Sequence, residues 1–297
     1  MKRCLIISTN ALGDTYLSLS ALPALKDMET DLLCPAAFKT YAEYFNLNKI
    51  FLLQSKKIKD VIELGMDMMD INYDYVFSFF PGRINTFFFN LAKSEIKCGY
   101  INCTNIPEWH NKPSKLSIRG KKKCHYIWRP ENNYLDRIFY ALYYTGLKPT
   151  NLNKLPLPYF KPAIIDKKFI ICNFSSRSEF RNLPKSSSDK ILNELNKVYN
   201  GEVFLLSDKQ DEDYIINYSD TENVLNHIIS SEAFIGVDSF PLHIADAYNK
   251  KIIGLFSNTN SASAFQNSND KVMLKEPDLN NISPQEIIKS LNSLNII

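Results

Sequence analysis

Short apolar runs alternate along the chain with longer segments in which apolar positions recur at helical spacing. Strands are predicted at residues 4–8, 31–34, 49–53, 75–79, 169–172, 203–206, 233–235 and 251–256. Helices are predicted at residues 15–27, 37–45, 58–69, 85–93, 133–144, 185–199, 211–217, 223–230 and 239–248, with a final helix that begins near Ser283 and Pro284. This alternation is typical of α/β proteins, in which helices cover parallel sheets.

Two segments interrupt the pattern. Between residues 102 and 129 both periods are lost, and the segment is basic. Residues 151–161 contain Pro156 and Pro158 and carry little pattern, so we interpret them as a linker. The chain is therefore predicted to form two Rossmann-like domains, residues 1–155 and residues 156–297. The pattern leaves open whether the last helix packs on the C-terminal domain or back on the N-terminal one.

Composition narrows the class of protein. The net charge of +3 is too small for general nucleic-acid binding. The cysteines include no CxxC pair, which favours reduced, buried thiols over disulfides or a zinc site. The N-terminus does not resemble a signal peptide, and no apolar stretch approaches the roughly 20 residues that span a bilayer. We therefore expect a cytoplasmic protein.

A first candidate site, Asn10-Ala11-Leu12-Gly13-Asp14, lies between the first strand and the first helix. Ligands of open α/β sheets bind outside the carboxyl ends of the strands, so the Asp14 carboxylate is placed where chemistry can occur. The alternative is that Asp14 caps its helix. Because there is no GxGxxG motif, no dinucleotide cofactor is predicted.

Two further candidate sites fall in the second half. At residues 234–243 an apolar strand leads through Gly236 to Asp238, Ser239 and His243, at a helix N-terminus suited to phosphates. Ser175, Ser176 and Arg181 follow the strand at residues 169–172, and an arginine there can bind a pyrophosphate. The alternatives are a capping pair with a structural histidine at the first place, and a solvated loop at the second.

Together these motifs resemble glycosyltransferase family 9, the heptosyltransferase family. The residues that carry the resemblance, in the order of the family, are Leu12-Gly13-Asp14, Leu19-Ser20-Ala21-Leu22, Leu25-Lys26, Ser175-Ser176, Arg181, Pro184, Ile235-Gly236-Val237-Asp238-Ser239, His243, Ala245, Ala247 and residues 252–256. This sequence departs from the family at Ser20, where proline is usual, and at Leu183, where tryptophan is common. It also has Phe240 in place of a small glycine, which crowds the phosphate-binding turn.

The resemblance implies a GT-B type fold, with two Rossmann-like domains facing each other across a cleft. It implies inverting, metal-independent transfer of a heptose from ADP-heptose to a lipopolysaccharide or lipooligosaccharide core, with Asp14 as the general base. The donor-binding residues that it implies are Ser175, Ser176, Arg181, Asp211, Asp238, Ser239 and His243. Candidates for the acceptor side are Gly13, Arg83, Lys121 and Lys122.

Two charged segments of the chain each allow two interpretations. Asp211-Glu212-Asp213 has the form of a metal-binding DxD motif, but acidic residues are also expected at the start of a helix. The basic segment from Lys112 to Arg129 fits either a solvated loop or a surface that docks an anionic glycolipid at the inner membrane.

Two other functions fit the same residues. One is a GT-B transferase or epimerase that uses another nucleotide sugar. The other is a non-catalytic module that binds a sugar nucleotide, which Phe240 favours.

Overall fold

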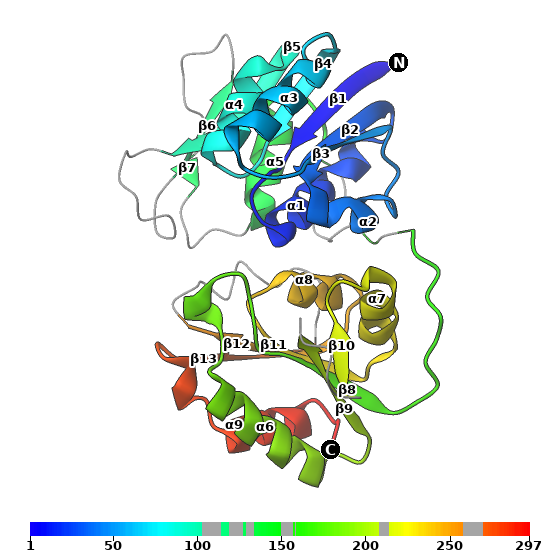
Figure 1. Ribbon diagram of the computed structural model, residues 1–297, viewed down its shortest axis with the longest axis vertical. Coiled ribbons are helices and arrows are strands. Elements are labelled where there is room, and N and C mark those ends of the chain that lie inside the picture. The colour runs from blue at the N-terminus through cyan, green and yellow to red at the C-terminus, as the bar shows by residue number, and fades with distance from the viewer. Residues whose placement is uncertain are drawn as a thin grey trace. The chain divides into compact units, whose positions relative to one another are not determined.

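The computed structural model describes residues 1–102, 114–118, 127–128, 134–149, 157, 159–207, 214–257 and 270–297. The chain divides into two compact units, Met1–Tyr159 and Phe160–Ile297, and each is an α/β unit with its own sheet (Figure 1). From the sequence, the domain boundary was expected between residues 155 and 156.

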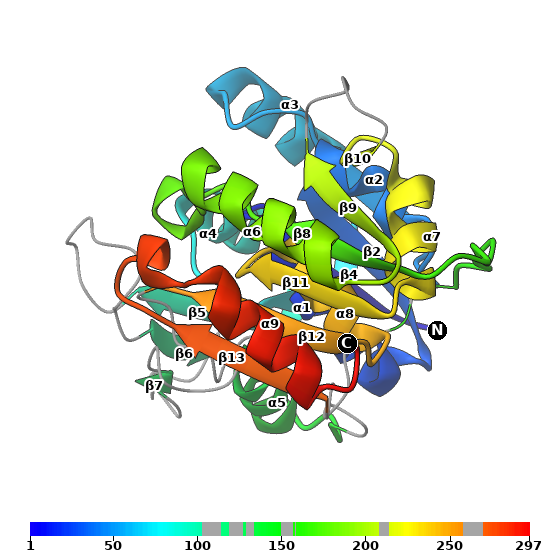
Figure 2. The same ribbon diagram turned by 90° about the horizontal axis from the view of Figure 1, so that it is seen from below.

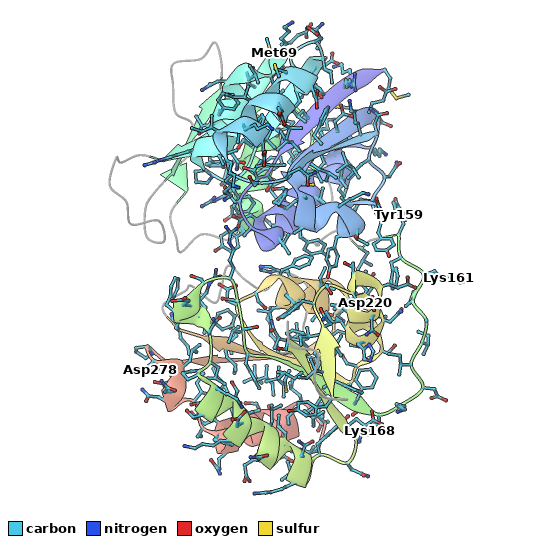
Figure 3. All side chains as sticks on the ribbon, viewed as in Figure 1. Met69, Tyr159, Lys161, Lys168, Asp220 and Asp278 are labelled. Atoms are coloured by element: carbon cyan, nitrogen blue, oxygen red, sulfur yellow. The ribbon has the colours of Figure 1, made fainter. Side chains whose placement is uncertain are left out.

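The segment that enters the second unit runs from Tyr159 past Lys161 to Lys168, just before the first strand of that unit (Figure 3). Two of its backbone N–H groups donate to side chains of the C-terminal unit. Ala163 N–H donates to Asn226 Oδ1 at 2.8 Å, and Ile165 N–H donates to Ser230 Oγ at 3.0 Å. These bonds fasten the segment to the C-terminal unit.

The N-terminal unit contains a sheet of strand order β3-β2-β1-β4-β5-β6-β7. Its strands are β1 (Lys2–Ile7), β2 (Met28–Pro35), β3 (Lys49–Leu53), β4 (Asn72–Ser78), β5 (Lys93–Asn102), β6 (Ser114–Ile118) and β7 (Ile127–Trp128), of which β1 to β5 are parallel. Its helices are α1 (Leu12–Ser18), η1 (Leu19–Leu25), η2 (Ala36–Phe38), α2 (Lys39–Ala42), α3 (Ile58–Met68), α4 (Arg83–Leu91) and α5 (Tyr134–Tyr144). Leu5, Val76 and Phe88 form part of the core between the strands and helices α3 and α4.

The C-terminal unit contains a fully parallel sheet of order β10-β9-β8-β11-β12-β13. Its strands are β8 (Phe169–Asn173), β9 (Glu202–Ser207), β10 (Ile215–Asn217), β11 (Ala233–Val237), β12 (Lys251–Phe256) and β13 (Lys271–Lys275). Its helices are η3 (Glu179–Arg181), α6 (Lys185–Val198), α7 (Thr221–Ser230), α8 (Phe240–Ala247), η5 (Leu279–Asn281) and α9 (Pro284–Ser293). Helices α6 and α9 cover one face of the sheet, and α7 and α8 cover the other (Figures 1 and 2).

The last helix, α9, begins where the sequence predicted. Ser283 accepts a hydrogen bond from Glu286 N–H, and Glu286 accepts in return from Ser283 N–H, a capping box that also lowers the pKa of Glu286. Its buried residues Ile287 and Leu291 belong to the core of the C-terminal unit. Of the two surfaces left open by the sequence pattern, this helix uses the C-terminal one.

Some predicted elements are wrong. The single helix predicted at residues 15–27 is α1 followed by the 3₁₀ helix η1, which contains Pro23; proline cannot donate the backbone bond that would continue an α-helix. Residues 215–217 form strand β10 instead of the end of a helix. Strands β5, β6, β7 and β13 were not predicted. Polar residues interrupt the apolar positions of β5 and β6, whereas β7 has only two residues and β13 has only three apolar ones in a row.

The thiols that the structure describes are buried and free, as predicted. They belong to Cys4, Cys34, Cys98 and Cys172, and burial raises the pKa of Cys34 to about 12. Such thiols stay protonated at neutral pH, so they do not act as nucleophiles or metal ligands. Cys103 and Cys124 lie outside the described residues.

Candidate functional site

In each sheet the strand order reverses at one place, where neighbouring loops leave the sheet in opposite directions. These places are the carboxyl ends of β1 and β4 in the N-terminal unit and of β8 and β11 in the C-terminal unit. We call them the β1/β4 edge and the β8/β11 edge. Ligands of open α/β sheets bind at such reversal points. The described site residues predicted from the sequence lie on segments that follow these four strands.

A buried amide joins the two loops of the β1/β4 edge. Asn85, on α4, is 1% exposed, and its Oδ1 accepts from Thr9 N–H at 2.8 Å and from Thr9 Oγ1 at 2.7 Å. Its Nδ2 donates to Phe80 O at 2.9 Å. One side chain therefore satisfies groups in the loops after β1 and after β4, and holds the start of α4 against the loop that leads into α1.

A close contact between Asn10 and Gly82 adds to this fixation. Asn10 Nδ2 donates to Pro81 O at 3.0 Å. A Cβ atom at Gly82 would lie 2.6 Å from Asn10 Oδ1, which is too close for a larger residue unless Asn10 moves. A larger residue at position 82 would therefore have to displace the Asn10 side chain, which is bonded to Pro81 in the same loop.

Asp14 lies inside the first turn of α1. The N-cap of this helix is Ala11, so Asp14 is not the capping residue that the alternative interpretation requires. The side chain of Asp14 is partly exposed, and its backbone oxygen accepts from Ser18 Oγ at 2.7 Å. Gly13 precedes it in the same turn, and Arg83 is the exposed first residue of α4. The β1/β4 edge therefore presents one carboxylate and one cation at helix N-termini.

At the β8/β11 edge a glycine allows two strands to approach closely. Gly236 of β11 is paired with Asn173 of β8 on one side and with Gly254 of β12 on the other. A Cβ atom at Gly236 would lie 2.9 Å from the Asn173 backbone oxygen and 2.7 Å from Cε1 of Phe234. The glycine that the sequence placed before the phosphate-binding turn is thus required by strand packing.

Asn173 connects three segments of this edge. Its side-chain Nδ2 donates to Ser239 Oγ at 2.7 Å. Its Oδ1 accepts from Ser175 N–H at 3.4 Å and from the Tyr218 hydroxyl. The residue is fully buried, so these bonds are shielded from water. The sequence prediction did not include Asn173 among the site residues; the signal was a polar amide at the end of a buried strand.

Arg181 and Asp238, both predicted to bind the donor, form an ion pair. Arg181 Nη1 lies 2.9 Å from Asp238 Oδ2, and the two side chains are 24% and 8% exposed. Arg181 Nε is buried and has no hydrogen-bond partner among the residues that the structure describes. The pair therefore brings a guanidinium with remaining donors to the start of α8.

The two serines of the preceding loop differ. Ser176 Oγ donates to Ser178 O at 3.0 Å and accepts from Ser178 N–H at 3.2 Å, so its hydroxyl stabilises the turn. Ser176 N–H also donates to Asn182 Oδ1 at 2.5 Å. Ser175 is exposed. Of the predicted hydroxyl pair, Ser175 is the one better placed to contact a ligand.

Helix α8 begins after Ser239, and the Ser239 side chain does not cap it. The backbone N–H groups of the first turn therefore have no side-chain acceptor from the N-cap, which suits an anion. His243 is 5% exposed, and its Nδ1 is buried with no hydrogen-bond partner in the described part of the chain. Phe240, the first residue of α8, is partly buried.

Three predicted site residues lie outside the described residues: Asp211, Lys121 and Lys122. The same holds for most of the basic segment and for the remainder of the DxD motif. Within the described ranges, no group of three His, Cys, Asp or Glu side chains is arranged to hold a metal ion. No helix in those ranges is long and apolar enough to cross a bilayer.

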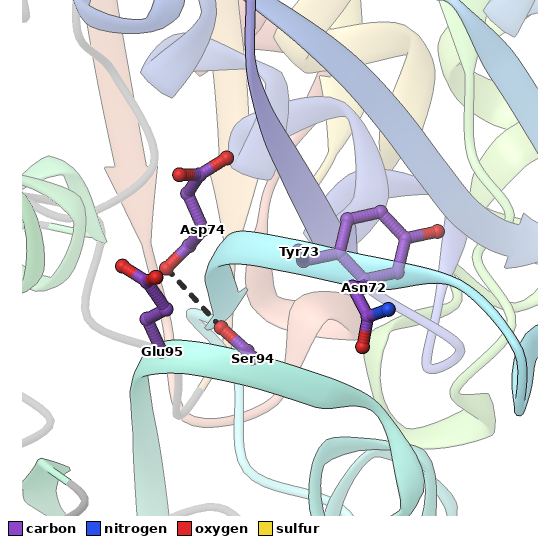
Figure 4. Close-up of a pocket in the computed structure, with 5 residues that line it drawn as sticks. All are labelled: Asn72, Tyr73, Asp74, Ser94 and Glu95. Atoms are coloured by element: carbon purple, nitrogen blue, oxygen red, sulfur yellow. Dashed lines mark hydrogen bonds between the residues drawn. The ribbon is translucent and has the colours of Figure 1, made fainter.

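A cavity of about 400 Å³ lies at the opposite edge of the N-terminal sheet, at the amino ends of β4 and β5 (Figure 4). Its lining includes Tyr73 and the acidic residues Asp74 and Glu95. Arg3 N–H donates to Asp74 Oδ2 at 2.7 Å, and Ser94 Oγ donates to Asp74 O at 3.2 Å. Two carboxylates would repel a diphosphate, so we place the candidate site at the carboxyl edges instead.

Comparisons with known proteins give the family and the fold. The sequence model of a family described as "Glycosyltransferase family 9 (heptosyltransferase)" matches residues 220–290, which include Asp238, Ser239 and His243. No protein of curated function matches the chain in sequence.

Three solved structures share the fold over nearly the whole chain. The E. coli heptosyltransferase WaaC with ADP has a TM-score of 0.74 at 13% identity, covering 98% of this chain and 99% of its own. A family 9 glycosyl transferase from Veillonella parvula has a TM-score of 0.71 at 13% identity, with 99% and 97% covered. The E. coli ADP-heptose heptosyltransferase II has a TM-score of 0.65 at 15% identity, with 99% and 98% covered. The α/β fold of GT-B type predicted from the sequence is confirmed.

Proposed function

We propose a donor, an acceptor and a mechanism for this chain, which belongs to glycosyltransferase family 9 by the match over residues 220–290 and has the corresponding fold. The reaction is transfer of a sugar, a heptose from ADP-heptose, to a lipopolysaccharide or lipooligosaccharide core. The transfer inverts the anomeric centre and needs no metal ion. Family and fold support the class of enzyme, a glycosyltransferase; the donor, acceptor and stereochemistry are our proposal.

The observation that carries this proposal is the arrangement at the start of α8. The uncapped helix N-terminus and the Arg181 guanidinium lie at one reversal point of a parallel sheet. The start of α8 and Asp238, the partner of Arg181, lie inside the segment that the family model matches, whereas Arg181 itself precedes it. Asp238 partly offsets the charge of Arg181 and fixes its direction. Because Nε and further guanidinium N–H groups remain, Arg181 can bind a phosphate without giving up Asp238.

The diphosphate of the donor therefore binds at the β8/β11 edge. It accepts hydrogen bonds from backbone N–H groups of α8, from Ser239 and Ser175, and from Arg181. As the bond between the anomeric carbon and the phosphate oxygen breaks, negative charge grows on the leaving diphosphate. The helix dipole and the guanidinium stabilise that charge without any rearrangement. Asp211 and His243 complete the set of donor-binding residues that we propose.

Asp14 acts as the general base. It accepts the proton of the acceptor hydroxyl while the acceptor oxygen forms its bond to the anomeric carbon. Attack from the face opposite the leaving diphosphate inverts the configuration at that carbon. The fixed loops of the β1/β4 edge hold α1, and with it Asp14, in place. Gly13, Arg83, Lys121 and Lys122 are the residues that we propose for the anionic acceptor.

An anionic acceptor at the inner membrane would bring the protein to that surface. The basic segment from Lys112 to Arg129 supports this interpretation through its charge. We therefore propose a cytoplasmic enzyme that associates peripherally with the membrane, without nucleic-acid partners.

A thermal-shift screen with ADP, UDP, GDP and CMP tests the donor. A ligand present at 100 times its Kd adds about 2.7 kcal/mol to the free energy of unfolding, so ADP should raise the melting temperature more than the other nucleotides. Turnover is then measured with ADP-heptose and a core acceptor in the presence of EDTA. A larger shift with another nucleotide would contradict the proposal that ADP-heptose is the donor. Loss of activity in EDTA, with recovery when manganese is added, would contradict the metal-independent mechanism.

The alternatives give different results in the same assay. An epimerase converts the nucleotide sugar or releases free nucleotide and forms no acceptor-linked product. A non-catalytic module binds the nucleotide and gives no turnover with any acceptor.

A further inference from the structure

We propose that Asn173 is a positioning residue that makes the Ser239 hydroxyl a hydrogen-bond donor to a phosphate oxygen of the bound nucleotide. This inference rests on the proposed function of the β8/β11 edge. Asn173 ends β8 and is fully buried, while Ser239 is the partly exposed N-cap of α8. Asn173 therefore contacts Ser239 from the protein interior, and Ser239 lies nearer the surface.

The orientation of the Asn173 amide is fixed by its neighbours. The backbone N–H of Ser175 can only donate, so the atom that it meets at 3.4 Å must be the amide oxygen, Oδ1. The Tyr218 hydroxyl, from the segment between β10 and α7, donates to the same oxygen. The amide nitrogen is therefore the atom that faces Ser239 Oγ, at 2.7 Å.

This orientation determines what Ser239 can do. An amide nitrogen carries hydrogen atoms and no free lone pair, so Ser239 Oγ must accept from it. The single hydroxyl proton of Ser239 then points away from Asn173. Ser239 Oγ accepts no hydrogen bond from the N–H groups of α8, and no acceptor for its proton occurs among the described residues. The Ser239 hydroxyl can therefore donate its proton to a ligand at the N-terminus of α8.

A donating hydroxyl at this place matches one class of ligand group. An ionised phosphate oxygen can only accept hydrogen bonds, whereas a sugar hydroxyl can both donate and accept. Ser239 therefore adds a fixed donor to the backbone N–H groups of α8. Gly236 contributes indirectly, because the missing Cβ lets β11 lie close to the backbone oxygen of Asn173.

Replacing the amide by a carboxylate, Asn173→Asp, tests the inference. The carboxylate still accepts from Ser175 and Tyr218, but its second oxygen must now accept from Ser239, which uses the proton meant for the ligand. It also adds negative charge beside the phosphates. At pH 8, ADP affinity measured by calorimetry should fall about ten- to a hundredfold. Below the pKa of the new carboxyl group, the protonated acid donates again, so the difference from wild type should shrink toward pH 5.

Asn193→Asp is the matched control, because Asn193 is exposed on α6 and the change adds the same charge to the same unit. It should bind ADP as wild type does at both pH values. In a Ser239→Ala background, Asn173→Asp should reduce affinity less than it does in wild type, because no hydroxyl remains to be turned. Ser239→Ala alone should weaken ADP binding about tenfold or more, and this variant keeps the test open if the buried carboxylate prevents folding.

Three results would overturn the inference: wild-type affinity in Asn173→Asp, a loss that is equal at both pH values, or wild-type affinity in Ser239→Ala. A wild-type protein that fails to bind ADP, UDP, GDP or CMP would instead overturn the proposed function itself, and the inference with it.

Discussion

The β1/β4 edge and the β8/β11 edge lie at equivalent points of two similar sheets, but different bonds hold them. At the β1/β4 edge neutral groups join the loops: Asn85 binds Thr9 and Phe80, and Asn10 binds Pro81. At the β8/β11 edge an ion pair between Arg181 and Asp238 lies beside the helix N-terminus. The bonds described for the first edge join neutral groups, whereas the second edge adds an ion pair to the bonds of a buried amide, Asn173.

This difference corresponds to two tasks in the proposed reaction. A general base must exchange a proton, so it works best when the bonds that fix its loop do not depend on its charge. A site for a leaving diphosphate gains from charged and dipolar groups that are already in position. The comparison leads to predictions that separate catalysis at one edge from donor binding at the other.

The largest effect is expected for Asp14→Asn, which removes the proposed base without changing its size. The turnover number should fall by about 10²- to 10⁴-fold, because general-base catalysis contributes that much. Nucleotide affinity should stay within twofold of wild type, since the diphosphate binds at the other edge. Steady-state kinetics and calorimetry measure the two quantities, and Asp67→Asn, an exposed carboxylate on α3, is the control. A variant that turns over normally and only melts earlier would assign Asp14 a structural role.

Arg181→Ala should lower nucleotide affinity, the quantity that Asp14→Asn leaves unchanged. Loss of a charge-assisted contact to the diphosphate costs roughly 1.5–3 kcal/mol, or about ten- to a hundredfold in nucleotide affinity. The change also leaves the Asp238 carboxylate, 8% exposed, without the partner seen here, which repels the phosphates further. Arg177→Ala in the same loop is the control, because Arg177 is exposed. If Arg181→Ala bound nucleotide as well as wild type, the placement of the donor site would be wrong.

Asn85→Ala tests whether the bonds that hold the β1/β4 edge matter for turnover but not for nucleotide binding. It leaves Thr9 and Phe80 with unsatisfied groups in a buried place, which should reduce the free energy of unfolding by roughly 1–3 kcal/mol. Thermal melting measures the loss, and Asn90→Ala, the same substitution at an exposed position of α4, is the control. Turnover should fall because the α1 loop is no longer fixed, while nucleotide affinity is kept. A fall in affinity equal to the fall in turnover would show that the two edges are not separate.

The smallest effect is expected for Phe240→Gly. Phe240 is the first residue of α8 and is partly buried. The resemblance to glycosyltransferase family 9 implies a small glycine at this position. Removing the ring should leave nucleotide affinity unchanged or raise it slightly, because space for the phosphates increases. Calorimetry with ADP tests this. A clear loss of affinity would show that the ring itself contacts the nucleotide in this chain.

Much of the fold follows from local pattern. Parallel strands such as residues 233–237 are buried on both faces and are nearly continuous apolar runs, so the sequence identifies them. Strand β13, which has only three apolar residues between Lys271 and Lys275, and the three-residue strand β10 lie at the ends of their sheet and carry little signal. Pairing with a neighbouring strand decides their structure, and one sequence does not reveal that pairing.

The candidate site also has features that the sequence predicts and features that it does not. The helix N-terminus after Gly236 could be predicted, because strand, glycine and capping residue are adjacent in the sequence. The bonds that Asn85 and Asn173 make could not, since Asn85 lies 76 residues from Thr9 and Asn173 lies 66 residues from Ser239. Such bonds depend on which strands become neighbours at a reversal point. Sequence motifs therefore identify the groups proposed to contact a ligand. The residues that hold those groups in position, such as Asn85 and Asn173, can be recognised only in the tertiary structure.

The chain passes from one unit to the other only once, between Tyr159 and Phe160. All described residues of the proposed donor site lie after that point, and Asp14 and Arg83 lie before it. A single recombination event at this position would therefore exchange one complete half of the proposed reaction for another. Descendants of such a protein could acquire a new acceptor while keeping their sugar nucleotide. The order of the chain would thus let recombination separate the two proposed specificities.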